Sequence, residues 1–152
     1  MAASEVIRAA SPAETEACGE ALARRIEPGD VILLEGDLAA GKTTYVRGLL
    51  RGLGGDPSDA NSPTFVVVQS YPCSGRVSVL HHIDLYRLPD DPEALREIGL
   101  EEFLGDERAV VAVEWPRPAL GSFFGSGARL WRIRLTLEGE EQRRIDIHRS
   151  EF

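Results

Sequence analysis

The sequence predicts a single α/β domain over residues 1–152, built in three layers around a mixed sheet with parallel strands at its centre and antiparallel hairpins at its edges. Three observations predict it. The apolar run Val31–Glu35 passes through a glycine-bearing loop into a helical segment, as a buried parallel strand does. Two pairs of β-patterned segments meet at short polar turns, as hairpins do. The length of 152 residues, 43% hydrophobic and 28% charged, suits one globular domain.

The first third of the chain is predicted to alternate helix and strand. Ser11-Pro12-Ala13-Glu14 forms a capping box with proline at the first helical position, which opens a helix running to about Ile26. After the strand Val31–Glu35 and its loop, a second helix is expected over Thr43–Leu53. Gly54-Gly55 then terminates that helix, because glycine readily adopts the left-handed conformation common at helix ends.

Beyond residue 54 the pattern becomes rich in strands. Gly54–Asn61 and Arg117–Gly127 are rich in turn-forming residues and are predicted to be loops, whereas Pro92–Ile98 is predicted to be a short helix. The predicted strands are, in order, Phe65–Tyr71, Val77–Ile83, Val110–Glu114, Leu130–Leu137 and Arg143–His148. The first two and the last two of these strands are each expected to form a hairpin.

The charge balance limits the kinds of partner, because a net charge of −8 opposes extensive direct contact with nucleic acid. No apolar run reaches the roughly 20 residues of a membrane helix. Met1–Ala10 lacks the apolar core of a secretory signal, and Cys18 and Cys73 lack ligand spacing. A cytoplasmic protein with reduced thiols and no membrane partner is expected. Six arginines near the C-terminus are interpreted as a solvated face, with an RNA-binding patch as the alternative: Arg129, Arg132, Arg134, Arg143, Arg144 and Arg149.

Residues 36–43, GDLAAGKT, match the pattern G-x-x-x-x-G-K-[ST] completely and lie between a predicted buried strand and a predicted helix. This combination indicates a P-loop. Gly36 allows the sharp exit from the strand, and Gly41 lets the backbone approach a phosphate without a Cβ in the way. The amides of about residues 38–43 are then able to form an anion nest at the helix N-terminus.

Lysine usage supports the same site. Among the 17 basic residues the only lysine is Lys42. A compact ammonium fits against phosphates where a planar guanidinium does not, so this is the position expected to keep a lysine. Lys42 is expected to be a charge on the surface of the loop and to reach the β- and γ-phosphates of a nucleotide. The Thr43 hydroxyl is expected to bind Mg²⁺.

A P-loop needs an acidic residue at the end of a neighbouring strand, which holds the metal directly or through water. Asp84 follows the strand Val77–Ile83, and Glu114 ends another strand. Ligands of open α/β sheets bind at such carboxyl ends. We assign Asp84 to the outer shell of the magnesium and Glu114 to the metal or the attacking water, although spacing does not separate these two roles. Thr64, at a strand entry, either senses the γ-phosphate or simply begins the strand.

Three neighbouring side chains leave alternatives open. His81 and His82 are adjacent on a strand and face opposite sides, so they cannot bind one ion together. They are predicted to be core or surface histidines. Trp115 follows Glu114 directly. It packs either near the nucleotide or a partner, or in the core.

Four ordered segments resemble the bacterial TsaE (YjeE) family of ATPases. They are GDLAAGKTT at 36–44, SPTF at 62–65, HIDLYRL at 82–88 and EWP at 114–116. The resemblance extends from about Ser11 to Ile147. Its main departure is Ala39, where the family usually has glycine, so Ala39 requires either a negative φ or a tolerated strain.

The resemblance implies the ATPase component of tRNA threonylcarbamoyladenosine synthesis, which uses ATP and Mg²⁺ and acts with the TsaD and TsaB proteins, with tRNA contacted only indirectly. It also implies that Thr15 lies near the adenine and that Thr64 is a switch-like threonine. Motif and resemblance together place catalysis on Lys42, Asp84, Glu114 and Thr64, and metal binding on Thr43, Asp84 and Glu114. The predicted nucleotide-binding residues are Gly36, Leu38, Ala39, Ala40, Gly41, Lys42, Thr43, Thr44, Thr15 and Trp115.

Two other functions compete with this interpretation, and one of them conflicts with the sequence. A P-loop kinase acting on a small metabolite or nucleoside needs an acceptor site and a lid arginine pair, for which Arg143-Arg144 is the adjacent pair late in the chain. A GTP-driven switch reads guanine with an N-K-x-D motif, which is excluded because Lys42 is the only lysine. No residue stands out as an arginine finger, so hydrolysis without partner proteins is expected to be slow.

Overall fold

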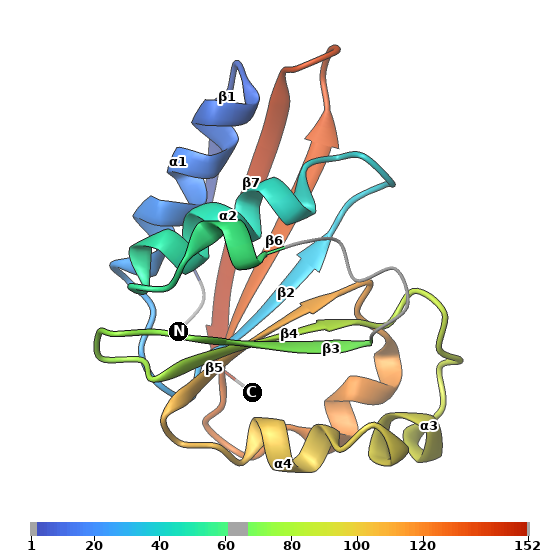
Figure 1. Cartoon of the computed structure of the whole chain (residues 1–152). Helices are drawn as coiled ribbons and strands as arrows, with labels where there is room; N and C mark the ends of the chain where they lie inside the picture. The colour runs from blue at the N-terminus through green and yellow to red at the C-terminus, as the bar shows by residue number, and fades with distance from the viewer. Residues whose placement is uncertain (1–2, 61–66, 152) are drawn as a thin grey trace.

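A computed structural model, which describes residues 3–60 and 67–151, contains a seven-stranded mixed sheet with helices on both faces (Figure 1). The strand order is β1-β7-β6-β2-β5-β4-β3. The strands are β1 (Ala3–Ala9), β2 (Val31–Glu35), β3 (Val68–Pro72), β4 (Val79–Asp84), β5 (Ala109–Glu114), β6 (Arg129–Leu137) and β7 (Arg143–Glu151). The predicted α/β class with a layered mixed sheet is confirmed.

The centre of the sheet is parallel and its edges are antiparallel, as predicted. β2 runs parallel to both β5 and β6, and β5 runs parallel to β4. The hairpins β3–β4 and β6–β7 add antiparallel strands on the two sides. β2 and β5 are buried along nearly their whole length, which explains their unbroken apolar sequences. The carboxyl ends of β2, β5 and β4 therefore lie side by side at one edge of the sheet.

Helices α1 (Pro12–Ala23) and α2 (Lys42–Gly52) cover one face of the sheet (Figure 1). The two helices approach so closely that a Cβ added at Gly48 would lie 1.7 Å from a carbonyl oxygen of α1. A Cβ added at Gly19 would lie 2.2 Å from a carbonyl oxygen of α2. Glycines at this crossing thus determine where α2 sits, and with it the loop that enters α2.

Helices α3 (Pro92–Glu97) and α4 (Leu100–Leu104) cover the other face together with the 3-10 helix η2 (Pro118–Phe123). Leu95 and Leu100 are fully buried and belong to one apolar cluster with the β4 and β5 side chains of this face. Because both faces of β5 are covered, its end is held rigidly between two apolar layers.

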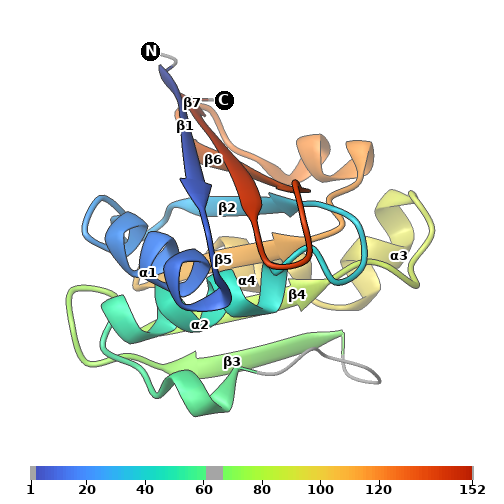
Figure 2. The same cartoon turned by 90° about the horizontal axis from the view of Figure 1, so that it is seen from above.

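The sequence did not predict β1. This strand pairs with β7 at the edge of the sheet, so the two ends of the described chain lie side by side (Figure 2). Most of its residues are exposed. A strand without a buried face shows no regular apolar alternation, so its sequence carries no signal for a strand.

Several predicted boundaries shift at the helices. The Ser11 hydroxyl caps α1 by accepting a hydrogen bond from Glu14 N, as predicted, but the helix ends at Ala23 rather than Ile26. The predicted loop after α2 contains the 3-10 helix η1 (Pro57–Asp59), and α4 was missed because five residues carry too little periodicity to recognise. Of the helices that the structure describes, none has the length and apolar character needed to span a bilayer.

The hairpin β3–β4 is confirmed with shorter strands than predicted. β4 begins at Val79 rather than Val77, and β3 runs over Val68–Pro72. The first two residues of the predicted strand Phe65–Tyr71 lie outside the described residues. The second predicted hairpin, β6–β7, is confirmed and continues to Glu151.

Candidate phosphate-binding site

The carboxyl ends of β2, β4 and β5 form the candidate site. Asp84 and Glu114 are register partners on the neighbouring strands β4 and β5, so their side chains leave the same face of the sheet. Glu114 is also the partner of Leu34, two residues before the loop 36–41. The loop leaves β2 here and runs into α2. The sheet therefore brings the loop and both predicted carboxylates to one place, as the sequence predicted.

The path of the loop is set by three residues with positive φ. Gly36 has φ 152°, and a Cβ there would lie 2.7 Å from the Leu135 carbonyl oxygen. Gly41 has φ 100° and precedes the first residue of α2. Ala39 has φ 64°. Of the two expectations for this residue, a negative φ or a tolerated strain, the tolerated strain is therefore correct. This region costs a non-glycine residue about 1–2 kcal/mol. Leu38, before it, is 65% exposed.

Lys42 is the first residue of α2 and has only 6% of its surface exposed. Its Nζ donates a hydrogen bond to the Gly36 carbonyl oxygen (2.6 Å) and lies 3.5 Å from the centroid of the Trp115 ring. The expectation of a charge on the surface of the loop is therefore wrong, because the Trp115 ring packs against the ammonium group. The lysine lies at the site as predicted, but as a buried cation.

The pKa values of Lys42 and Asp84 are both shifted by their surroundings. Burial lowers the pKa of Lys42, and the negative charges of Glu114, Asp84 and Asp37 act against that decrease. Burial also raises the pKa of Asp84, with a further increase from the charge of Glu114. The hydrogen bond that Asp84 Oδ1 accepts from Tyr86 N (2.9 Å) works in the opposite direction. The site thus holds both signs of charge in partly desolvated positions.

His82 is a candidate functional residue that the sequence reasoning missed. Its Nε2 lies 2.5 Å from Glu114 Oε2 and its Nδ1 lies 3.1 Å from the Tyr71 hydroxyl, and His82 and Glu114 are both buried. In the tautomer with its hydrogen on Nε2, His82 donates to the Glu114 carboxylate, which accepts hydrogen bonds through its oxygens. The sequence signal was that His82 and Asp84 share one face of β4. The register of β4 against β5, which only the structure supplies, makes His82 a diagonal neighbour of Glu114.

His81 faces the opposite side of the sheet, as predicted. Its Nδ1 lies 2.8 Å from the Ser70 hydroxyl and its Nε2 lies 3.4 Å from Asp106 Oδ2. Among the described residues, no group of three or more His, Cys, Asp or Glu side chains is placed to hold a metal ion. Mg²⁺ bound together with phosphates needs only one or two carboxylates from the protein. The hydroxyl and carboxylate oxygens predicted as ligands are hard donors that suit such an ion.

Trp115 lies between the loop and a surface hollow. Of the alternatives left open for this residue, the structure supports packing at the site and not in the core. The residue has φ 57°, and its ring centroid is 4.9 Å from that of Tyr86. A hollow of about 560 Å³ adjoins the ring and is lined also by Gly36 and Asp37 of the loop and by Arg134 of β6.

Besides Lys42, three of the predicted site residues belong to the helices beside the loop. Thr15 of α1 is 1% exposed, and its Cγ2 is 3.6 Å from the position of a Cβ at Gly41. Its hydroxyl is buried, and within residues 3–60 and 67–151 it has no hydrogen-bond partner. Thr43, in the first turn of α2, is half-buried, as is Thr44 beside it. Thr64 lies outside the described residues.

Most of the C-terminal arginines form ion pairs with neighbouring carboxylates, which agrees with the prediction of a solvated face. Arg132 and Arg134 of β6 both bind the carboxylate of Glu35, at the end of β2. Arg144 of β7 pairs with Asp146 on the same strand, at 3.2 Å. These pairs neutralise much of the positive charge that the RNA-binding alternative would require.

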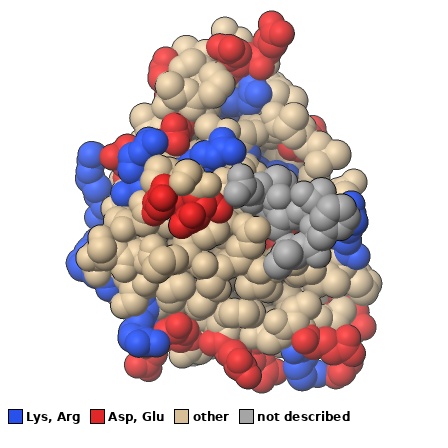
Figure 3. All heavy atoms as spheres, in the orientation of Figure 1, with Lys and Arg blue, Asp and Glu red and all other residues tan. Residues whose placement is uncertain are grey.

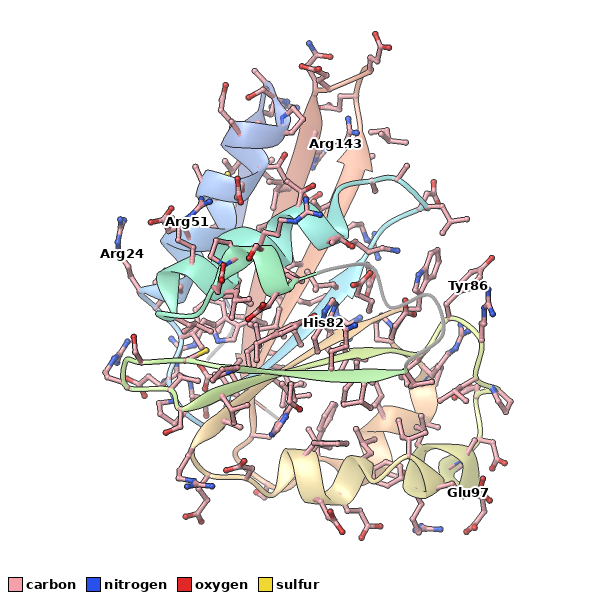
Figure 4. All side chains as sticks on the ribbon, viewed as in Figure 1. Arg24, Arg51, His82, Tyr86, Glu97 and Arg143 are labelled. Atoms are coloured by element: carbon pink, nitrogen blue, oxygen red, sulfur yellow. The ribbon has the colours of Figure 1, made fainter. Side chains whose placement is uncertain are left out.

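Arg143 behaves differently from its neighbours. Its Nε donates to the Ala40 carbonyl oxygen (3.0 Å) and its Nη2 to that of Ala39 (3.3 Å). Figure 4 shows Arg143 beside the loop that joins β2 to α2. Arg143 and Arg144 leave opposite faces of β7, as adjacent strand residues must. They therefore do not form the lid pair that a kinase would need.

A loop of this path, joining a buried parallel strand to a helix that begins with lysine, defines the class of P-loop proteins. Within that class the chain belongs to the TsaE family. The family model described as threonylcarbamoyl adenosine biosynthesis protein TsaE matches residues 9–145. The resemblance drawn from the four sequence segments is thereby confirmed.

Individual relatives agree with this assignment. The tRNA threonylcarbamoyladenosine biosynthesis protein TsaE of Bacillus subtilis is 42% identical over 108 residues, which is 71% of this chain and 64% of that protein. The protein of the same name from Streptomyces coelicolor is 40% identical over 97 residues, 64% of each chain. The match thus spans just under two thirds of these relatives' lengths. The crystal structure of Bacillus subtilis YdiB superposes with a TM-score of 0.69 at 30% identity, covering 97% of this chain and 86% of that one.

Proposed function

We propose that the chain binds ATP with Mg²⁺ at the loop 36–43 and hydrolyses it. The observation that carries this proposal is the buried ammonium of Lys42, held 2.6 Å from the Gly36 carbonyl oxygen beside the ends of the strands that bear Asp84 and Glu114. Burying a cation is costly unless a negative group compensates it. A triphosphate at the loop, next to the helix N-terminus, supplies such a group.

Each part of the site has a role in this proposal. The loop amides and Lys42 bind the phosphates, and the Thr43 hydroxyl holds the metal, with the Asp84 carboxylate in its outer shell. The metal, when bound, offsets the charge that develops on the phosphate oxygens. Glu114, oriented by His82, holds the metal or positions the attacking water. Thr64 remains predicted to sense the γ-phosphate, and Thr15 and Trp115 to contact the nucleotide.

The same proposal places the activity in the synthesis of tRNA threonylcarbamoyladenosine, in concert with TsaD and TsaB. The family assignment and the names of the relatives support the place in this synthesis, and the sequence resemblance supplies the two partners. Figure 3 shows acidic side chains over α3 and α4 and at the tip of the β6–β7 hairpin, and the net charge is −8. Such a surface repels a phosphate backbone. Contact with tRNA is therefore assigned to the partner proteins.

The deciding experiment measures phosphate release from ATP by the chain alone, and with a TsaD–TsaB pair and tRNA. We expect slow hydrolysis alone and faster hydrolysis with the partners, and ATP should outcompete GTP. No binding of Mg-ATP by the chain would contradict the proposal. A kinase is the second candidate, since the hollow of about 560 Å³ beside Trp115 has room for an acceptor. Transfer of labelled phosphate to an added nucleoside or metabolite, instead of to water, would favour it.

A further inference from the structure

Arg143 joins two parts of the chain that are far apart in sequence. Besides the two loop carbonyl oxygens, its guanidinium reaches three carbonyl oxygens of the β6–β7 turn through Nη1: Gly139 (3.3 Å), Glu140 (3.2 Å) and Gln142 (2.9 Å). Within residues 3–60 and 67–151, no carboxylate forms an ion pair with it. The guanidinium is thus bound entirely by main-chain oxygens and links the hairpin to the loop.

The loop segment that Arg143 contacts contains a turn that ordinarily has glycine at the position where this chain has alanine. Ala40 N donates to the Asp37 carbonyl oxygen (3.0 Å), which closes a four-residue turn. Ala39 is the third residue of this turn and has φ 64°. A turn with positive φ at its third residue alone is of type II, which ordinarily requires glycine there. The two carbonyl oxygens that Arg143 binds, those of Ala39 and Ala40, belong to the two successive peptides that follow the strained residue.

We propose that Arg143 is a positioning residue that holds the phosphate-binding loop in its anion-binding path and compensates for alanine at position 39. Without the guanidinium, Ala39 is free to relax to a negative φ, which opens the turn that the Ala40 N to Asp37 carbonyl hydrogen bond closes and moves the loop out of its anion-binding path. The inference rests on the proposed function only for its effect on nucleotide binding. The effect on the loop itself requires no nucleotide.

The first test measures hydrogen exchange of the Ala40 amide in nucleotide-free protein. Arg143→Ala should speed this exchange about tenfold, because the guanidinium then no longer opposes the relaxation of the strained φ of Ala39. The double variant Arg143→Ala with Ala39→Gly should return it to within about threefold of wild type, because glycine adopts this φ without strain. Arg144→Ala is the matched control, since it removes a neighbouring arginine from the other face of β7 and should leave the exchange unchanged.

The second test compares kinetic constants for Mg-ATP. Arg143→Ala should raise KM about tenfold and change kcat less than threefold, and glycine at position 39 should restore KM. If Arg143→Ala does not fold, as judged by its melting temperature, Arg143→Lys replaces it, because a single ammonium cannot bridge two sets of carbonyl oxygens. Unchanged Ala40 exchange in the Arg143 variant, or fast exchange that glycine at position 39 does not restore, overturns the inference. A wild-type protein that binds no ATP overturns the proposed function but leaves the exchange test valid.

Discussion

The imidazole of His82 and the carboxylate of Glu114 form a buried pair, with Nε2 2.5 Å from Oε2. The pair lies where β4 and β5 end, next to Asp84, the register partner of Glu114. A histidine that donates one ring hydrogen to a carboxylate fixes the direction of the carboxylate's other oxygen. In the proposed ATPase this geometry keeps Glu114 pointed at the metal or the water rather than at solvent.

The first prediction concerns that pair. His82→Ala should lower kcat for ATP hydrolysis 10- to 100-fold, the usual cost of removing a group that orients a ligand, with little change in KM. His82→Gln should recover part of the loss, because its amide nitrogen is able to donate to Glu114. His81→Ala is the control, since His81 faces the opposite side. Steady-state kinetics check this, and equal losses in the His81 and His82 variants would contradict it.

The second prediction concerns Lys42. Lys42→Met keeps the length of the side chain and removes a buried charge, so the free energy of unfolding should change by about 1 kcal/mol or less. Affinity for Mg-ATP should fall about 30-fold or more, as for other buried charge pairs that lose one partner. Urea unfolding and a binding titration measure the two effects separately. Binding at wild-type strength would remove Lys42 from the phosphate site.

The parts of this site that the sequence predicts are those with local causes. The loop follows a strand and precedes a helix within a few residues, and Asp84 and Glu114 each lie at the end of a predicted strand. The pairing of His82 with Glu114 depends instead on the register of β4 against β5. The contact of Arg143 with Ala40 crosses 103 residues and depends on β6 lying beside β2. Neither register nor strand order is written in the periodicity of one segment.

The same distinction explains the misjudged burial of Lys42. The motif predicts a lysine at the start of the helix, which is a local property. Its low exposure comes from the Trp115 ring, which follows the end of β5 and reaches the lysine only because β5 is next to β2. Packing of this kind follows from tertiary structure and has no signal in the loop sequence.

The third prediction concerns pH and the carboxylate of Glu35. Burial raises the pKa of Glu35, but the hydrogen bonds from Arg134 and Arg132 outweigh it, so the pKa is lowered overall. A carboxyl group with a lowered folded-state pKa stabilises the fold above its unfolded pKa, and this contribution is lost as the pH falls through the folded value. Glu35→Gln should therefore lower the free energy of unfolding by about 1 kcal/mol at neutral pH and by less in acid. Denaturant unfolding across the pH range measures this, and a constant difference would contradict it.

The fourth prediction concerns the crossing of α1 and α2, on which the position of the loop depends. Gly48→Ala places a Cβ 1.7 Å from the Glu16 carbonyl oxygen, and backbone cannot yield as the end of a side chain does. The helices must separate, so the free energy of unfolding should fall by about 2–3 kcal/mol. Gly121→Ala is the matched control, because no atom lies within 4 Å of its added Cβ, and it should change stability by no more than about 0.5 kcal/mol. Denaturant unfolding compares the two, and equal stabilities would show that the crossing has room for a methyl group. Since α2 carries Lys42 at its start, the Gly48 variant should also bind Mg-ATP more weakly than the Gly121 variant.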